Sequence, residues 1–363
     1  MPLRNYTSEF AQILASLSKQ GRAARADHGV PLVRQLLDLL LLRACSGKLR
    51  ADDYYNLRLY REGISFSEKR QYASNRALPK TLVGRWSIVA ADKLLTYSIL
   101  SSFGIAIPKI HAVCHHFREY RGSTTLRTIA DVSSYLRSSA PYPLIAKPVM
   151  GSWSKNVNLL KEYCAATDSV VLEGDGAHNV LRLAEQFFST GSGYLIQELL
   201  RPHQEISRVI SDKICTLRVI ILLERNCSHL FMAVWKINVG ASAADNYWRE
   251  GNLLAKLDQE TGEILQCITG LGPKHRVVER HPKTGQLLAG FRVPQYRETI
   301  SLALRASKSF PGVPMQAWDI AITDKGPIPL ELNFPGSLLI PQLISEKGIW
   351  RGPFRDFVTT AHG

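Results

Sequence analysis

The chain has 363 residues, enough for two to three domains whose core needs no disulfide or metal support, so a small secreted scaffold is excluded. Charged residues make up 21% of it and hydrophobic residues 45%, which excludes a disordered chain and a membrane bundle. Lys and Arg number 45 against 31 Asp and Glu, and this net charge of +14 favours a polyanionic partner: a nucleotide, nucleic acid, anionic lipid or acidic glycan.

The six cysteines are scattered along the chain, without a CxxC pair or a regular spacing. This pattern argues against a zinc knuckle and against a disulfide framework. The first residues lack the apolar core of a signal peptide, and charged residues interrupt the most apolar stretch, 32–44. The sequence therefore predicts a cytoplasmic protein without a membrane span.

Residues 1–90 are predicted to be helical. Pro31 opens a leucine-rich helix from a first-turn position, and Gly47 closes it as a C-cap. Tyrosines and arginines then alternate over 54–61, a spacing that suits stacking on RNA bases but is more typical of a helix that packs its aromatic face. We favour the packing interpretation.

From Asp92 onward the pattern changes to short strands separated by few helices. Asp92 is the predicted N-cap of a helix whose core-facing positions are Leu94, Leu95, Ile99, Leu100 and Phe103. The predicted strands are 143–149, 156–160, 169–173, 194–199, 216–223, 229–239, 253–258 and 263–268, with helices near 177–188 and 295–309. Because this order differs from a regular βαβ repeat, we expect an α+β protein rather than a Rossmann sheet.

The strongest local signal is a predicted hairpin over residues 315–334, with its turn at 323–326. Side chains alternate between the two faces of a strand, so Glu331 and Asn333 share one face of the second strand. The opposite face of this strand is predicted to be apolar and to carry Ile328, Leu330, Leu332 and Phe334.

Pairing of Ile322 with Ile328 would place Asp319 directly opposite Glu331. Two carboxylates in this position repel each other, which makes sense when a cation lies between them. Oxygen ligands of this kind suit magnesium shared with phosphate groups, so the hairpin is a candidate metal site. The alternative is a solvated outer face with no ligand.

Cationic residues elsewhere point to phosphate. Lys147 lies on a strand that runs into the turn 151–156, whose backbone N–H groups are suited to hold phosphate. Arg218 alternates with apolar residues on a strand, where an unpaired guanidinium is costly and a bound phosphate would satisfy it. Each feature also has a purely structural interpretation: an exposed Lys147, an Arg218 paired with an acid, and Glu198 and Glu205 as carboxylates at a rim.

Taken in order, these segments resemble the ATP-grasp superfamily of carboxylate–amine and carboxylate–thiol ligases, and within it the sugar-transfer-associated branch. The resemblance covers residues 88–350. It rests on Asp92–Leu95, Ala146–Pro148, Gln197–Glu198 with His203, Thr216–Val219, Asp245–Tyr247, Asp258–Gly262, His281–Gly285 with Gly290–Phe291, Trp318–Ala321 and Glu331–Asn333.

The resemblance implies an ATP-grasp fold, in which two α+β lobes hold ATP between them after a helical N-terminal region. The expected divisions are 1–90, a small lobe with its leading helix over 91–200, and a large lobe with the metal site over 201–363.

The resemblance also implies a role for each site residue. Lys93 and Lys147 would neutralise the α- and β-phosphates, and Arg218 would face the γ-phosphate. Adenine would be read by Glu198 and by the backbone of Leu199 and Leu200, with the ribose held by Glu205, and Gln197 is a further candidate for binding the nucleotide. Two magnesium ions would be bound by Asp319, Glu331 and Asn333. Two further candidates are Lys236, for phosphate, and Asn246, for the acceptor.

The function that follows is an ATP-dependent ligase that joins a small-molecule carboxylate to an amine through an acyl phosphate. Charge neutralisation by magnesium and by the basic side chains is the main requirement of phosphoryl transfer. The expected setting is natural-product, cell-surface glycan or amino-acid-conjugate biosynthesis, with an anionic or carrier-bound acceptor among the admissible substrates.

Two alternatives remain at the level of sequence. One is an ATP-grasp kinase that phosphorylates a hydroxyl group, and the other is a non-catalytic basic binding protein. A P-loop nucleotide site is excluded because no GxxxxGK[ST] motif occurs. Residues 1–90 are expected to form either the acceptor side of the site or the interface of a homo-oligomer.

Overall fold

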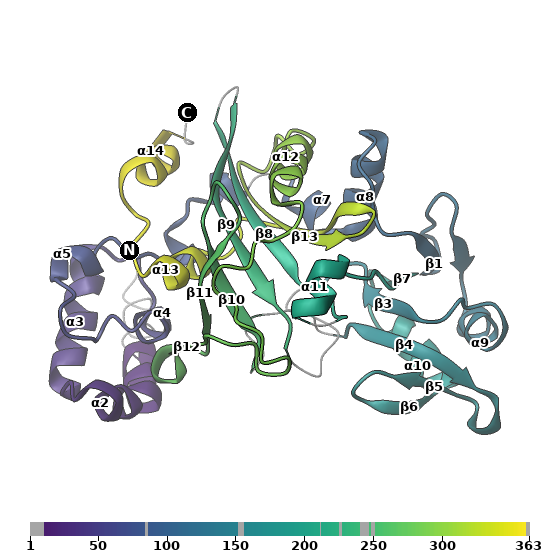
Figure 1. Cartoon of the computed structure of the whole chain (residues 1–363), viewed down its shortest axis with the longest axis horizontal. Helices are drawn as coiled ribbons and strands as arrows, with labels where there is room; N and C mark the ends of the chain where they lie inside the picture. Colours follow the sequence, from purple (N-terminus) through teal and green to yellow (C-terminus); the bar gives the residue numbers. More distant parts are fainter. Residues whose placement is uncertain are drawn as a thin grey trace.

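The computed structural model describes residues 11–83, 86–151, 156–210, 212–224, 227–239, 247 and 251–360. Two seven-stranded sheets dominate this part of the chain (Figure 1). The mixture of largely antiparallel sheets and flanking helices is the α+β architecture that the sequence predicts.

The first sheet has the strand order β2-β1-β7-β3-β4-β5-β6. Its strands are β1 (Ile110–Cys114), β2 (Thr124–Leu126), β3 (Leu144–Pro148), β4 (Asn158–Cys164), β5 (Ser169–Leu172), β6 (Gly176–Asn179) and β7 (Tyr194–Glu198). Helices α9 (Ile129–Ser138) and α10 (Val180–Phe188) share a hydrophobic core with this sheet. This sheet and its two helices form the lobe at the right of Figure 1.

The second sheet has the order β12-β11-β10-β9-β8-β13-β14. Its strands are β8 (Thr216–Glu224), β9 (Cys227–Ile237), β10 (Leu253–Leu257), β11 (Ile264–Thr269), β12 (Arg276–Val277), β13 (Met315–Thr323) and β14 (Gly326–Asn333). Its largest core also contains residues of α7 (Ser87–Ala91), α8 (Lys93–Ser102), α11 (Gln204–Val209) and α12 (Tyr296–Ser307).

The N-terminal region packs against the second sheet rather than standing apart from it. Its helical elements are η1 (Leu17–Gly21), α2 (Arg22–His28), α3 (Leu32–Cys45), α4 (Ala51–Asn56), α5 (Phe66–Lys69), η2 (Asn75–Ala77) and α6 (Lys80–Val83). A second core joins these helices to β9, β10, β11 and α13 (Leu339–Ser345). Helix α14 (Gly352–Thr360) packs with residues 73–82 over β8 and β13. The short turns η3 (Ala165–Thr167) and η4 (Gly272–Lys274) complete the elements.

The tyrosine and arginine stretch 54–61 is a packing element, which confirms the interpretation favoured from sequence. Tyr54, Tyr55 and Tyr60 are fully buried, and their rings contact one another at centroid distances of 5.1–6.4 Å. Buried rings in edge-on and tilted contacts contribute apolar area and leave no face for a stacked base. RNA stacking on these three residues is therefore excluded.

Two details of the sequence prediction are wrong. The helix predicted over 177–188 begins only at Val180, because Asn179 accepts hydrogen bonds from the N–H groups of Leu181 and Arg182 and so caps it, while 176–179 pair as β6. In α8, Leu95 and Phe103 are exposed instead of facing the core. None of the helices in the described ranges is both long and apolar enough to cross a membrane.

Candidate active site

One cavity of about 870 Å³ is lined by both sheets and by the N-terminal region. The sequence-predicted residues that line it are Lys93, Lys147, Gln197, Leu199, Leu200, Arg218, Lys236, Asp319, Glu331 and Asn333. Long-range folding therefore brings together residues from α8, both sheets and the final hairpin. Asn246 lies outside the described residues, as does the stretch 152–155 of the predicted phosphate turn.

The final hairpin places Asp319 directly opposite Glu331, as the sequence predicts, but with a different register. Ile322 pairs with Pro327 rather than with Ile328. An irregularity between Asp319 and Ile320 then adds one residue to the second strand, which brings Asp319 level with Glu331. As a result, Leu330 leaves the apolar face assigned to it and lines the cavity beside Glu331.

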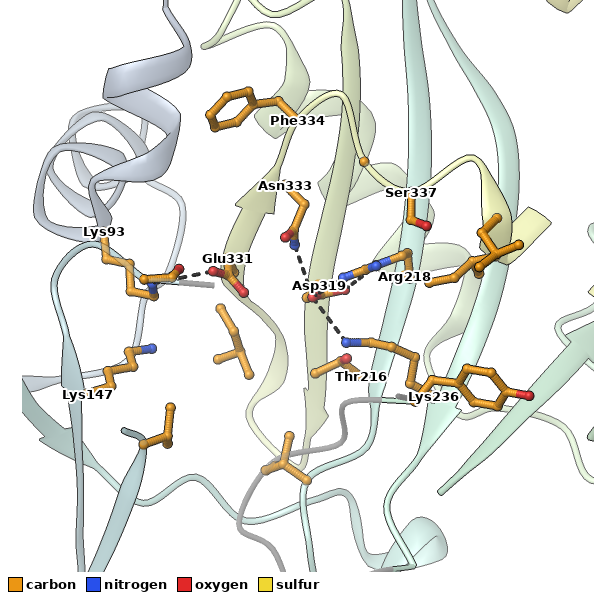
Figure 2. Close-up of a pocket in the computed structure, with 18 of the residues that line it drawn as sticks. Lys93, Lys147, Thr216, Arg218, Lys236, Asp319, Glu331, Asn333, Phe334 and Ser337 are labelled. Atoms are coloured by element: carbon orange, nitrogen blue, oxygen red, sulfur yellow. Dashed lines mark hydrogen bonds and ion pairs between the residues drawn. The ribbon is translucent and has the colours of Figure 1, made fainter. Parts of the chain in front are cut away.

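Asp319 is the centre of a buried charge network (Figure 2). Arg218 donates to its two carboxylate oxygens, from Nε at 2.8 Å and from Nη2 at 2.7 Å. Lys236 Nζ lies 3.1 Å from Oδ2, and Asn333 Nδ2 donates to the same oxygen at 3.2 Å. Of the two interpretations of Arg218, the structure supports the paired one: β8 and β13 place Arg218 beside Asp319, so the guanidinium has a partner without phosphate.

The pKa of Asp319 shows which effect wins in this network. Burial alone raises it, but the charges of Arg218 and Lys236 outweigh burial and lower the pKa to about 2. The carboxylate is therefore ionised across the physiological range. Mutual repulsion of Asp319 and Glu331 is relieved by basic side chains of the protein itself.

A second polar group surrounds Glu331. Lys93 Nζ lies 3.4 Å from its Oε1 and also 3.4 Å from the carbonyl oxygen of Gly151. Lys147 Nζ donates to Tyr97 Oη at 3.1 Å. Burial, and then the charge of Lys93, lower the pKa of Lys147 to about 7, although Glu331 acts in the opposite direction. Two buried ammonium groups near one carboxylate form a place for an anion.

Local structure explains how these two lysines come together. Asp92 accepts hydrogen bonds from the N–H groups of Leu94 and Leu95 and so starts α8 at Lys93. The backbone N–H of Lys93 donates to the carbonyl of Val149, just after β3, the strand that carries Lys147. The sequence pattern around each lysine is local, whereas the approach of Lys93 to Lys147 depends on this hydrogen bond between the start of α8 and the end of β3.

The residues predicted to read the base and ribose divide into two groups. Gln197 is only 4% exposed, and its Oε1 is a buried acceptor that has no hydrogen-bond partner within the described structure. The carboxylate of Glu198 instead accepts from the backbone N–H of Lys109 at 2.7 Å, and Glu205 is exposed in the first turn of α11. Glu198 and Glu205 are not among the lining residues, so the structure does not join their side chains to the others.

Residues that the sequence analysis missed form another wall of the cavity. They come from the N-terminal region and from the segment after β14: Arg50, Asp52, Asp53, Asn56, Ser74, Asn75, Arg76, Gly336 and Ser337. Asp and Ser in such positions look like ordinary helix caps and turns, so no local signal distinguishes them. Their contribution follows from the packing of residues 50–76 against the second sheet.

The described residues include no group of three or more His, Cys, Asp or Glu side chains that could hold a metal ion. The hairpin nevertheless offers oxygen donors of the type that magnesium prefers: the Glu331 carboxylate and the amide oxygen of Asn333. One or two protein oxygens are sufficient where phosphates supply the others. Asp319 is the least suited of the three predicted metal ligands, because its carboxylate oxygens are already paired with Arg218 and Lys236.

Comparison with solved structures gives distant similarities. An L-amino acid ligase from Bacillus licheniformis is 16% identical, with a TM-score of 0.35; the match covers 74% of this chain and 45% of that one. A D-alanine–D-alanine ligase from Bacillus anthracis is 13% identical, with a TM-score of 0.39 and coverage of 75% and 67%. The VanG D-Ala:D-Ser ligase from Enterococcus faecalis is 12% identical, with a TM-score of 0.41 and coverage of 79% and 63%. The chain thus spans less than half of the first of these proteins.

No curated protein sequence matches this chain. A family model does match, over residues 75–352, and its description is sugar-transfer associated ATP-grasp. This range contains both sheets, α8 and the final hairpin, the elements that bring the charged residues of the cavity together. The chain therefore belongs to the sugar-transfer associated ATP-grasp family.

Proposed function

We propose that this protein is an ATP-dependent ligase that joins a carboxylate to an amine in the cytoplasm. The observation that carries the proposal is the pair of buried lysines, Lys93 and Lys147, beside Glu331 in a cavity between two sheets of an ATP-grasp family member. Keeping two ammonium groups close together and buried is costly unless an anion joins them. A nucleotide polyphosphate supplies that charge.

The cavity also suits the base of the nucleotide. The amino group of adenine would donate to Oε1 of Gln197, the buried acceptor that has no partner in the described structure. Leu199 and Leu200 line the cavity just beyond β7 and provide apolar contact for the ring. The backbone of this segment, rather than the side chain of Glu198, would then complete adenine recognition.

Magnesium would be held by Glu331 and Asn333 together with phosphate oxygens. When bound, it supplies charge neutralisation for phosphoryl transfer. Arg218 and Lys236 are held in place by Asp319, so these two cations are oriented before a ligand arrives. Such preorganised charge stabilises negative charge on the transferring phosphoryl group without further rearrangement.

The proposed reaction has two steps. An oxygen of the substrate carboxylate attacks the γ-phosphorus and the bond to the β-phosphate oxygen breaks, which gives an acyl phosphate and ADP. The amine nitrogen then attacks the acyl carbon, inorganic phosphate leaves and the nitrogen loses a proton. The family's association with sugar transfer favours cell-surface glycan assembly, with an acidic sugar as the carboxylate.

Isothermal titration with a non-hydrolysable ATP analogue, with and without magnesium, tests the nucleotide site. We expect magnesium-dependent binding that Glu331→Gln weakens at least tenfold. Glu185→Gln, on the surface of α10, is the matched control and should bind as the wild type does. An affinity for the ATP analogue that depends neither on magnesium nor on Glu331 would overturn the proposal and favour the binding-protein alternative. Products then separate the reactions: ADP with an amide supports a ligase, and ADP with a phosphoester a kinase.

A further inference from the structure

The two ends of the cavity differ in charge. At the end outside the N-terminal wall, the lining holds five basic residues, Lys93, Lys147, Lys213, Arg218 and Lys236, against the four acidic residues Glu173, Asp212, Asp319 and Glu331. At the N-terminal end, Arg50 and Arg76 are balanced by Asp52 and Asp53. A polyanion therefore fits the first end, whereas the second end suits a ligand that carries both charges.

Asp53 is the most enclosed carboxylate of the N-terminal end. Its Oδ2 accepts a 2.5 Å hydrogen bond from Ser74 Oγ, and Ser74 Oγ in turn accepts from the backbone N–H of Arg50. Burial raises the pKa of Asp53, although Ser74 and Asn56 act against it by hydrogen bonding. A carboxylate in this setting gains from a cationic partner, because a positive charge offsets the cost of its burial.

Arg50 lies next to this carboxylate and provides the opposite charge. Its side chain is exposed, lines the cavity and forms no hydrogen bond or ion pair with the described residues. Arg50 is the N-cap of α4 and Asp53 lies in the first turn of this helix, so both residues stand at the same helix end, where the Arg50 charge lowers the pKa of Asp53. A guanidinium free to donate in two parallel directions is well suited to a carboxylate.

The wall that carries both groups is fixed relative to the reaction centre. Asn75 Nδ2 donates to the carbonyl of Gly336 at 2.6 Å, and Asn75 Oδ1 accepts from the N–H of Leu338 at 2.8 Å. Residues 336–338 follow the hairpin closely in sequence, and Figure 2 labels both Ser337 and Arg218 among the residues that line the cavity. A ligand on the N-terminal wall therefore lies in the same cavity as Arg218 and Asp319.

We infer that residues 50–76 form the acceptor subsite, and that the acceptor is an α-amino acid or a molecule ending in one, with its ammonium at Asp53 and its carboxylate at Arg50. The inference rests on the proposed function for the amine's role as the nucleophile. The bound ammonium loses two protons in forming the amide: the first passes to the Asp53 carboxylate and frees the nitrogen lone pair to attack the acyl carbon, and the second leaves with the inorganic phosphate. Residues 1–90 thus contribute to catalysis by holding one substrate.

Saturation-transfer NMR on the full-length protein tests this subsite without nucleotide. The probe is an equimolar mixture of the twenty protein amino acids, and we expect signal from one or a few. Asp53→Asn, which keeps the Ser74 contact, and Arg50→Gln, at an exposed position, should each weaken that binding by roughly tenfold or more, as loss of a charge-assisted hydrogen bond does. Arg182→Gln, on the surface of α10, is the matched control and should change nothing.

Nucleotide titration of the same preparations separates the two proposals. Asp53→Asn and Arg50→Gln should leave affinity for the ATP analogue within about twofold, since both residues belong to the other end of the cavity. No amino-acid signal in the wild type, or unchanged amino-acid binding in both variants, would overturn the acceptor subsite while leaving the nucleotide site intact. Amino-acid binding without nucleotide binding would instead support the subsite and overturn the ligase.

Discussion

The environment of a single residue, Lys147, indicates that the cavity is suited to an anion. It is 8% exposed, and burial together with Lys93 lowers its pKa to about 7. A lysine held in this state is poorly suited to stabilise the empty protein, because part of its charge is lost at neutral pH. The arrangement becomes favourable when phosphate oxygens replace the water that burial has removed.

Nucleotide binding should therefore be coupled to proton uptake at Lys147. Above about pH 7 the Lys147 side chain is mostly neutral in the nucleotide-free protein. Bound phosphates would raise its pKa again, so at about pH 8 nucleotide binding should take up close to one proton. Apparent affinity should fall, by up to about tenfold per pH unit, as pH rises above 7. Titration calorimetry in buffers of different ionisation enthalpy measures the uptake.

Lys147→Arg is the informative variant for that experiment. Arginine stays charged at every accessible pH, so proton uptake should vanish even where binding remains. Wild-type binding at about pH 8 without any uptake would contradict the assigned role of Lys147.

Asp319 makes a different contribution, because it compensates two buried cations. Asp319→Asn keeps the shape of the side chain but leaves Arg218 and Lys236 without their carboxylate. Breaking a buried pair in this way costs about 3–5 kcal/mol, and we expect the free energy of unfolding at neutral pH to fall by about this amount. Urea denaturation measures the change.

The pH dependence of that difference follows from the lowered pKa of Asp319. Its folded pKa of about 2 lies below the ordinary value of 3.8, so its stabilisation is fully present above about pH 4 and is lost as pH falls toward 2. The difference in unfolding free energy between the wild type and Asp319→Asn should narrow over that window, by about 2 kcal/mol. Asp168→Asn, which breaks the exposed pair with Arg137, is the control and should have little effect. An equal loss in both variants would contradict the account.

Among the elements, α8 matters because its first residue is a site lysine. Asp92 caps the helix and also forms a 2.7 Å ion pair with Arg118. One carboxylate therefore fixes both the start of the helix and its attachment to the first sheet's loops. The position of Lys93 depends on this cap.

Asp92→Ala should lower the free energy of unfolding by about 1–2 kcal/mol from the lost cap alone. It should also weaken nucleotide binding, because the first turn that carries Lys93 is no longer held. Asp92→Ser restores the cap without the ion pair, so it should recover most of the stability. Thermal unfolding and nucleotide titration of both variants provide the measurements; equal behaviour of Ala and Ser would argue against the cap.

The hairpin of β13 and β14 illustrates how an element can preserve a site while changing its register. Sequence periodicity correctly predicted Asp319 opposite Glu331, but it assumed regular pairing of Ile322 with Ile328. The extra residue in β14 turns Leu330 toward the cavity, where it lines the site. Alternation alone cannot foresee this, because a bulge reverses the facing of every residue beyond it.

At the scale of the whole molecule, the N-terminal region is tied to the segment after β14 by hydrogen bonds to its backbone. Gln342 of α13 accepts from the N–H of Ala73 at 2.9 Å and donates to its carbonyl at 2.8 Å. Trp350 N–H donates to the carbonyl of Gln71. Residues 71–75 therefore hold the segment after β14 in place, and with it one wall of the cavity.

Gln342→Leu should loosen this connection. It leaves the N–H and the C=O of Ala73 buried without partners, which costs about 2–4 kcal/mol in unfolding free energy. Hydrogen exchange should accelerate in residues 71–76 and 336–346 while β3 and β7 stay protected. Gln186→Leu on α10, a helix of the other lobe, is the control. Uniform acceleration across both sheets would show that the connection is not local.

The N-terminal region also carries an apolar surface. Val33, Leu37, Leu40 and Leu41 of α3 are exposed, at fractions of 37–70%. They recur at helical spacing and so lie along one side of the helix.

The homo-oligomer expected from the sequence stays a prediction, as do the domain boundaries at residues 90 and 200.

The sequence alone determined the α+β class, the positions of most strands along the chain, the leucine-rich helix, the cap at Asp92 and the residue types of the site. Each of these follows from local periodicity or from short-range hydrogen bonding, which neighbouring residues decide. The resemblance to the ATP-grasp family, now shown for residues 75–352, organised them into one expected cavity.

Only the tertiary structure decided which side chains meet. It paired Arg218 with Asp319 across two strands and turned Glu198 toward the backbone of Lys109. It also brought Arg50 and Asp53 into the lining of the same cavity as Arg218, although more than 100 residues separate them in sequence. These outcomes depend on packing between distant segments, and the position of Leu330 in the cavity lining depends on the bulge in β14. Neither leaves a periodic trace in the sequence, because contacts of this kind follow from the shape of the whole chain and not from its local pattern.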